Sequence, residues 1–139
     1  AARAWDTFRP MPSRRYARNH VWAKLDGERL LIGLSARAIE QLGEITGFTL
    51  RARPGEALAV GQCFAALESD KAEVELFTPV GGDVVHVHEG LELHPELIGE
   101  DPYGDGWMLE LRPADLAEWS ALLDAEAYSE LLKTASASA

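Results

Sequence analysis

Turn signals recur through residues 16–111 and divide this part of the chain into short segments. The clearest are Asp26-Gly27, Pro54-Gly55, the stretch 79–82 and the stretch 101–106. Apolar residues between the turns alternate with polar ones or form short runs. This pattern predicts strands over residues 16–25, 29–34, 44–53, 63–68, 72–78, 83–88 and 107–111. Many short strands with frequent turns favour a mainly β fold, a compact sandwich or barrel.

Helical patterns are fewer, and two of them lie at the C-terminal end. Ser35 can cap a short helix that Gly43 ends. His94-Pro95 suits the start of another, with the proline at its first position. Apolar residues at helical spacing predict two short helices over residues 113–123 and 124–133. The sequence therefore predicts a β sandwich decorated with short helices.

The two ends of the chain differ in composition from its body. Residues 1–15 contain arginines and prolines without a periodic apolar pattern, so we expect a flexible N-terminal arm. Residues 16–133 hold the predicted strands and helices and form one domain. Residues 134–139 are all small, and we expect a disordered tail.

Charge and cysteine content exclude several classes of protein. The chain has 13 Lys and Arg against 23 Asp and Glu, a net charge of -10, and such a surface repels the phosphates of nucleic acid. No apolar run approaches the roughly 18 residues of a membrane span. The single cysteine, Cys63, excludes an internal disulfide and a zinc site built from several cysteines. We expect a cytoplasmic monomer that binds neither nucleic acid nor membrane.

Lysine is scarce, and Lys71 occupies an unusual position. Ser69-Asp70-Lys71 lies between two predicted strands, so Lys71 should stand at the tip of a hairpin. Its acidic neighbours are Glu68, Asp70, Glu73 and Glu75. One interpretation is a solvated charged hairpin, in which the lysine relieves repulsion between carboxylates. The other is an amine held out on a rigid turn, where a modifying enzyme can reach it.

Motifs spread over residues 16–133 give this hairpin a context. Residues 66–72 read Ala-Leu-Glu-Ser-Asp-Lys-Ala, and Tyr16, His20 and Trp22 lie on the first predicted strand. Further motifs follow in the segments 32–43, 79–85, 95–107 and 124–128. In this order the segments resemble the glycine cleavage system H protein family, and residues 66–72 are similar to that family's lipoylation motif.

The resemblance implies a fold and a cofactor. The fold is the lipoyl/biotinyl type, a flattened hammerhead β sandwich, and the cofactor is lipoic acid in amide linkage on Lys71. Glu68, Ser69, Asp70 and Ala72 would form the hairpin that a lipoate–protein ligase or lipoyl transferase recognises. Such a domain performs no chemistry of its own. The protein would be a non-catalytic swinging-arm carrier, with dihydrolipoamide dehydrogenase among its partners.

The resemblance also implies a cleft for the lipoyl arm, formed by Asn19, His20, Val21 and Glu75. In H proteins a glutamate follows the histidine of the opening motif, and that region helps to hold the cationic aminomethyl cargo. Here Val21 stands in that place and offers no carboxylate. We therefore favour the H-like lipoate-binding proteins that serve heterodisulfide-reductase-like complexes in sulfur oxidation. The alternative is the aminomethyl carrier of the glycine cleavage system, with glycine cleavage enzymes as partners.

His86 and His88 support a third hypothesis, a small metal-binding domain. Alternate residues of a strand share one face, and Glu89 and His94 lie near in sequence. A zinc site needs three or four converging ligands, so this sparse set favours ordinary strand histidines, and we predict no metal site. No catalytic triad or phosphate-binding loop is apparent in the sequence, which favours a carrier over an enzyme.

Overall fold

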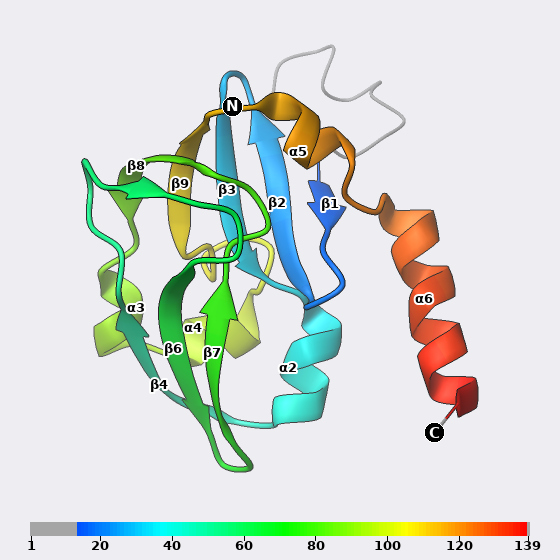
Figure 1. Ribbon diagram of the computed structural model, residues 1–139. Coiled ribbons are helices and arrows are strands. Elements are labelled where there is room, and N and C mark those ends of the chain that lie inside the picture. Colours follow the sequence, from blue (N-terminus) through cyan, green and yellow to red (C-terminus); the bar gives the residue numbers. More distant parts are fainter. Residues whose placement is uncertain (1–13, 139) are drawn as a thin grey trace, which may run out of the picture.

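Two antiparallel sheets form a β sandwich in the computed structural model, which describes residues 14–138 (Figure 1). One sheet has six strands in the order β1-β2-β3-β9-β8-β5, and the other has three in the order β4-β6-β7. The strands are β1 Arg14–Tyr16, β2 Val21–Asp26, β3 Arg29–Leu34, β4 Ile45–Leu50, β5 Ala57–Leu58, β6 Cys63–Ser69, β7 Glu73–Phe77, β8 Gly82–Val87 and β9 Leu109–Pro113. The predicted mainly β fold is confirmed.

The first hairpin follows directly from its turn signal. β2 and β3 pair from Val21 opposite Leu34 to Asp26 opposite Arg29. Gly27 at the turn has a φ of 65°, a left-handed conformation that glycine adopts without steric cost. The strand predicted over residues 29–34 coincides with β3.

The inner faces of both sheets bury one apolar core. Leu30, Ile32 and Leu109 come from the six-stranded sheet, Phe64 and Leu67 from the three-stranded one, and all are fully buried. Alternation along β3 directs Leu30 and Ile32 inward, whereas a register shift in β6 between Cys63 and Ala65 lets Phe64 and Leu67 both reach the core. Burial of side chains of this size contributes about 1.5–3 kcal/mol each. The core therefore fixes the position of the sheet that carries the β6–β7 hairpin.

A smaller cluster lies on the opposite face of β2, where helix α6 (Ala125–Ser138) docks. Tyr16, Trp22 and Tyr128 are its buried members, and the rings of Tyr16 and Tyr128 stack with centroids 4.4 Å apart. Gly33 pairs with Trp22 across the strands, and a Cβ at Gly33 would come within 2.5 Å of the indole. Glycine at position 33 therefore leaves the space that Trp22 occupies. Aromatic contacts anchor the C-terminal helix on this sheet.

Helix α2 (Ala36–Leu42) has the predicted caps. The Ser35 side chain accepts a hydrogen bond from the N–H of Ala38, and Gly43 follows the last turn with a φ of 82°. The remaining helices are α3 Gly90–Leu93, α4 Glu96–Glu100 and α5 Leu116–Ser120. The sequence did not indicate the single turn of α3, and Pro95 precedes the first helical residue of α4 instead of occupying that position. Within residues 14–138, no helix combines the length and apolar character needed to cross a bilayer.

The strand predicted over residues 16–25 is in fact two strands separated by a turn. The N–H of His20 donates to the carbonyl of Ala17 at 3.0 Å, and His20 itself has a φ of 71°. The Asn19 side chain accepts a hydrogen bond from the N–H of Val21 at 3.3 Å. Asparagine commonly stabilises a turn in this way, and here the local bonds outweigh the strand propensity of the flanking aromatic residues.

Both boundaries of the domain also differ from the prediction. Arg14 and Arg15, assigned to the arm, belong to β1 and pair with β2; residues 1–13 of the predicted arm lie outside the described residues. Helix α6 continues to Ser138, so residues 134–138 are helical in place of the predicted disordered tail. Alanine is the best helix former, and extending an existing helix avoids the cost of nucleation. The helix predicted over 113–123 is shorter and corresponds to α5.

Candidate functional site

The hairpin between β6 and β7 projects from the lower edge of the molecule and carries Lys71 at its tip (Figure 1). One hydroxyl organises the turn. Ser69 Oγ accepts hydrogen bonds from the N–H groups of Lys71 (3.2 Å) and Ala72 (3.1 Å), and it donates to the carbonyl of Ala72 at 3.2 Å. The N–H of Ser69 donates to the same carbonyl at 2.8 Å. Lys71 therefore stands on a turn with a fixed backbone, where we predicted it.

The end of helix α2 supports this tip. The N–H of Asp70 donates to the carbonyl of Glu44 at 3.0 Å. The Asp70 carboxylate lies so close to Gly43 that a Cβ at position 43 would overlap it. Gly43 also adopts a φ of 82° with a ψ of -147°, which L-residues rarely take. Gly43 thus both ends the helix and lets the hairpin approach, a second role that sequence reasoning missed.

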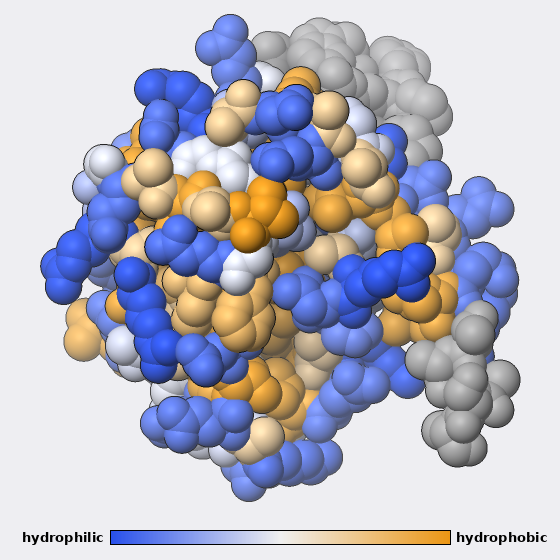
Figure 2. Space-filling view, in the orientation of Figure 1, coloured by the Kyte–Doolittle hydropathy of each residue, from blue (hydrophilic) through white to orange (hydrophobic). Residues whose placement is uncertain are grey.

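The Lys71 side chain is exposed and forms no ion pair within residues 14–138. Glu68, Asp70 and Glu73 beside it are exposed as well. Figure 2 shows mainly hydrophilic residues along this lower edge, with hydrophobic residues directly above them. Since no charged group among the described residues holds the amine in a salt bridge, it is available to a modifying enzyme.

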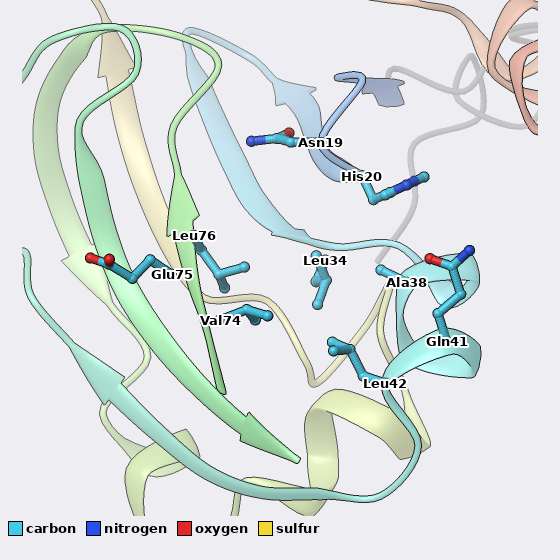
Figure 3. Close-up of a pocket in the computed structure, with 9 residues that line it drawn as sticks. All are labelled: Asn19, His20, Leu34, Ala38, Gln41, Leu42, Val74, Glu75 and Leu76. Atoms are coloured by element: carbon cyan, nitrogen blue, oxygen red, sulfur yellow. The ribbon is translucent and has the colours of Figure 1, made fainter. Parts of the chain in front are cut away.

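A cleft of about 250 Å³ lies beside β7, next to α2 and the turn that precedes β2 (Figure 3). Its apolar lining comes from Leu34, Ala38, Leu42, Val74 and Leu76. Asn19, His20 and Gln41 add two amides and an imidazole, and Glu75 completes the lining. The structure thus brings three predicted cleft residues, Asn19, His20 and Glu75, to one place. An apolar cleft of this kind suits an alkyl chain with a polar end.

Two of these three side chains have partners that direct them elsewhere. The Glu75 carboxylate accepts a hydrogen bond from Arg51 at 2.7 Å, and Figure 3 shows it turned away from the apolar lining of the cleft. The Asn19 amide donates to the carbonyl of Phe77 at 3.1 Å, which ties the turn before β2 to β7. Sequence reasoning missed Arg51, because its contact with Glu75 joins the residue after β4 to β7, 24 positions along the chain.

Val21, the fourth predicted cleft residue, does not line the cleft. Its side chain is 0% exposed and belongs to the main core. The alternation of β2 turns Val21 and Ala23 inward and Trp22 outward. The valine is therefore a core residue of this chain, and the sequence-based placement at the cleft is corrected.

Behind the cleft, His20 belongs to a chain of polar groups that the sequence did not reveal. His20 Nδ1 lies 2.6 Å from the hydroxyl of Tyr128, which lies 2.7 Å from Ser35 Oγ. Burial lowers the pKa of His20 below its ordinary value of 6.5, and the nearby Arg37 adds to this effect. Burial also raises the pKa of Tyr128. His20 is therefore a neutral imidazole near pH 7.

His86 and His88 have separate partners. His86 Nδ1 is 2.8 Å from a Glu110 carboxylate oxygen, whereas His88 Nδ1 is 2.7 Å from the carbonyl of Trp107. The His88 ring also stacks on the Trp107 indole, with centroids 4.5 Å apart. In the part of the chain that the structure describes, no three His, Cys, Asp or Glu side chains gather as a metal site would require.

A small β sandwich that displays one lysine on a rigid hairpin, beside an apolar cleft, defines a class of protein. Its geometry suits a carrier domain, in which a covalently attached group swings from an exposed tip and has a sheltered place nearby. The tip itself holds no set of acid, base and nucleophile that would perform a reaction.

Comparison with known proteins identifies the family. The sequence model of the glycine cleavage H-protein matches residues 14–135. The glycine cleavage system H protein of Magnetococcus marinus is 40% identical over 121 residues, covering 87% of this chain and 86% of the relative. That of Synechococcus sp. is 43% identical over 114 residues, covering 82% and 88%. A crystal structure of an H protein from Mycobacterium marinum has a TM-score of 0.78 at 27% identity, covering 88% of this chain and 98% of that chain. The chain belongs to the glycine cleavage H-protein family.

This membership decides several of the sequence-based predictions. H proteins are non-catalytic lipoyl carriers, so the predicted family, fold and carrier class are confirmed. The relatives named above are H proteins of glycine cleavage. The comparisons therefore favour our alternative, and they give no support to the sulfur-oxidation interpretation that we had preferred.

Proposed function

We propose that this protein is the aminomethyl carrier of a glycine cleavage system, with lipoic acid attached to Lys71. The observation that carries the proposal is the exposed Lys71 amine, which has no ion-pair partner among the described residues and stands on a turn that Ser69 fixes and Gly43 supports. The names of the relatives, glycine cleavage system H proteins, support this choice of pathway. In the sequence, the absence of a carboxylate at Val21 favoured a cargo other than an aminomethyl group. Val21 is a buried core residue, so this absence gives no information about the charged groups in the cleft.

The residues at the tip fit a lipoyl group. The amine is free to form an amide, and acylation would remove its charge and leave the surrounding carboxylates as a recognition surface. When bound, lipoate supplies a strained disulfide that opens by thiol exchange. The chain's own contribution is to hold the attachment point rigidly and to offer an apolar cleft lined by Leu34, Val74 and Leu76.

The partners follow from this role. A lipoate–protein ligase or lipoyl transferase would load Lys71, guided by Glu68, Ser69, Asp70 and Ala72. Glycine decarboxylase, aminomethyltransferase and dihydrolipoamide dehydrogenase would then visit the arm in turn. A reducing cytoplasm suits a carrier whose working group is a dithiol.

Lipoylation tests the attachment site. We expect incubation with lipoate–protein ligase, ATP and lipoate to add one lipoyl group to the wild-type chain, mapped by peptide mass spectrometry to Lys71. Lys71→Arg should fold normally and take no adduct, because an exposed turn lysine has little packing to lose. Lys24→Arg and Lys133→Arg are matched controls that should still be modified. An adduct on Lys24 or Lys133, or none on the wild type, contradicts the proposal.

Reconstitution tests the pathway. We expect the lipoylated wild type to support glycine-dependent release of CO₂ together with the three glycine cleavage enzymes, and Lys71→Arg to support none. A lipoylated wild type that remains inactive with these enzymes, while an authentic H protein is active, contradicts the glycine cleavage role and leaves the carrier role intact.

A further inference from the structure

Three groups link the C-terminal helix to the cleft. Ser35 Oγ lies 2.7 Å from the hydroxyl of Tyr128, and that hydroxyl lies 2.6 Å from Nδ1 of His20. Each hydroxyl has one hydrogen to donate, so the chain of bonds can run in either direction. The direction decides which nitrogen of His20 carries the proton, because a neutral imidazole has one donor and one acceptor.

The buried end of the chain fixes the direction. Ser35 is fully buried, and its oxygen already accepts a hydrogen bond from the N–H of Ala38 at 3.4 Å. Within residues 14–138, the Tyr128 oxygen is the acceptor available to the Ser35 hydrogen. If the chain ran from His20 toward Ser35, that hydrogen would be buried without a partner, which is costly. Ser35 must therefore donate to Tyr128, and Tyr128 must donate to Nδ1 of His20.

We propose that Tyr128 is a positioning residue for the cleft. Its hydroxyl holds His20 as the neutral Nε2–H tautomer, and the Nε2–H group can then donate a hydrogen bond to an acceptor atom of the lipoyl arm. His20 lines the cleft and is partly exposed, and within the described residues no group accepts a hydrogen bond from its Nε2. The tautomer follows from the hydrogen bonds alone, whereas the contact with the arm rests on the proposed lipoylation of Lys71.

The charges around His20 are consistent with this state. Arg37 from α2 is near enough to contribute to the lowered pKa of His20, the Tyr128 phenol from α6 bonds to the imidazole, and Tyr16 from β1 stacks on Tyr128. Glu75 also lines the cleft, but its carboxylate is paired with Arg51. Protonation of His20 would force Nδ1–H toward Tyr128 and reverse the chain of bonds. Burial and Arg37 both lower the pKa of His20 and so oppose that reversal.

Nitrogen-15 NMR of the histidine ring tests the tautomer in the unlipoylated chain. At pH 7.5 we expect the Nε2–H form of His20 to exceed the Nδ1–H form by about tenfold or more, given the cost of an unpaired buried hydroxyl. Tyr128→Phe keeps the ring and the stack with Tyr16 but should lose most of this preference. Tyr103→Phe is the matched control, since the Tyr103 hydroxyl bonds to the N–H of Ala36 and not to His20. An Nδ1–H form in the wild type, or an unchanged ratio in Tyr128→Phe, overturns the proposal.

A second variant covers the case in which Tyr128→Phe does not fold. Ser35→Ala removes the buried hydroxyl hydrogen that sets the direction of the hydrogen-bond chain, so the Nδ1–H form of His20 should rise several-fold. An unchanged ratio of the two tautomers overturns the proposal.

The contact between His20 and the lipoyl arm is tested separately. Lipoylation followed by reduction should shift the His20 Nε2 resonance, and Lys71→Arg treated in the same way should show no shift. A lipoylated chain without the shift overturns the contact, whereas a chain that takes no lipoyl group contradicts the proposed function and leaves the tautomer result standing.

Discussion

The hairpin tip and the cleft beside it are built in opposite ways. The tip is local: Ser69, Lys71 and Ala72 make its hydrogen bonds within four consecutive residues. The cleft is distant in sequence: residues 19–20, 34–42 and 74–76 line it, and Tyr128 from the last helix holds His20. Local bonds survive small changes elsewhere in the fold, whereas a cleft made of distant segments depends on all of them. Substitutions that impair attachment of the lipoyl group at the hairpin tip should therefore differ from those that impair its binding in the cleft.

The largest expected effect comes from the core behind the cleft. Val21→Glu should destabilise the fold by about 3–5 kcal/mol, because it buries an uncompensated charge at a fully buried position. Chemical denaturation measures this loss. The same substitution at Val60, which is 55% exposed, should cost little. If Val21→Glu were as stable as Val60→Glu, position 21 would face solvent or the cleft, and the distinction between core and cleft would need revision.

Gly43→Ala should cause the next largest loss of stability. Gly43 lies where the end of α2, beside the cleft, contacts Asp70 of the hairpin tip. An L-residue at positive φ costs about 1–2 kcal/mol, and the added Cβ would also displace the Asp70 carboxylate. Gly61→Ala shares the positive φ, at 84°, but a Cβ there meets nothing within 4 Å. Denaturant unfolding should therefore show a larger loss for Gly43→Ala, and its lipoylation rate should fall while that of Gly61→Ala does not. Equal losses would show that the contact with Asp70 is unimportant.

Ser69→Ala probes the tip by itself. The substitution removes the side-chain hydrogen bonds that order the turn, each worth about 0.5–1.5 kcal/mol when buried and less on an exposed loop. We expect slower lipoylation of Lys71 and a loss of stability near 1 kcal/mol or below. Ser120→Ala, which removes one hydroxyl bond within α5, provides the comparison. Should Ser69→Ala be lipoylated at the wild-type rate, a preorganised turn is not required for attachment.

The smallest effect is the pH dependence contributed by His20. Its pKa is lower in the folded protein than the ordinary value of 6.5, so the unfolded chain binds more protons below that pH. The contribution to the free energy of unfolding is complete above pH 6.5 and is lost as the pH falls through the folded pKa. His20→Asn removes the titrating imidazole, and asparagine can adopt the φ of 71° found at position 20. Urea unfolding from pH 8 to pH 5 should show the wild type losing stability relative to His20→Asn; parallel curves would contradict the lowered pKa.

Much of the tip could be predicted from the sequence because its causes are local. A short run of small and apolar residues predicted β6, alternation predicted β7, and a polar turn between them placed Lys71 at the apex. The Ser35 cap and the Gly43 stop of α2 were predicted for the same reason, since a capping bond joins residues three apart. The turn after Tyr16 was missed although it too is local, because aromatic residues on both sides favoured a continuous strand.

The sequence by itself determined that the chain is mainly β, that Lys71 stands on an exposed hairpin and that the family is that of the H proteins. Only the tertiary structure decided that Val21 belongs to the core, that Glu75 turns to Arg51 and that Tyr128 holds His20. The reason is physical. A strand pattern shows that residues alternate between two faces, but which face meets the cleft depends on how the sheets pack. Contacts such as that of Tyr128 with His20 join residues 108 positions apart, and only the packing of α6 brings them together.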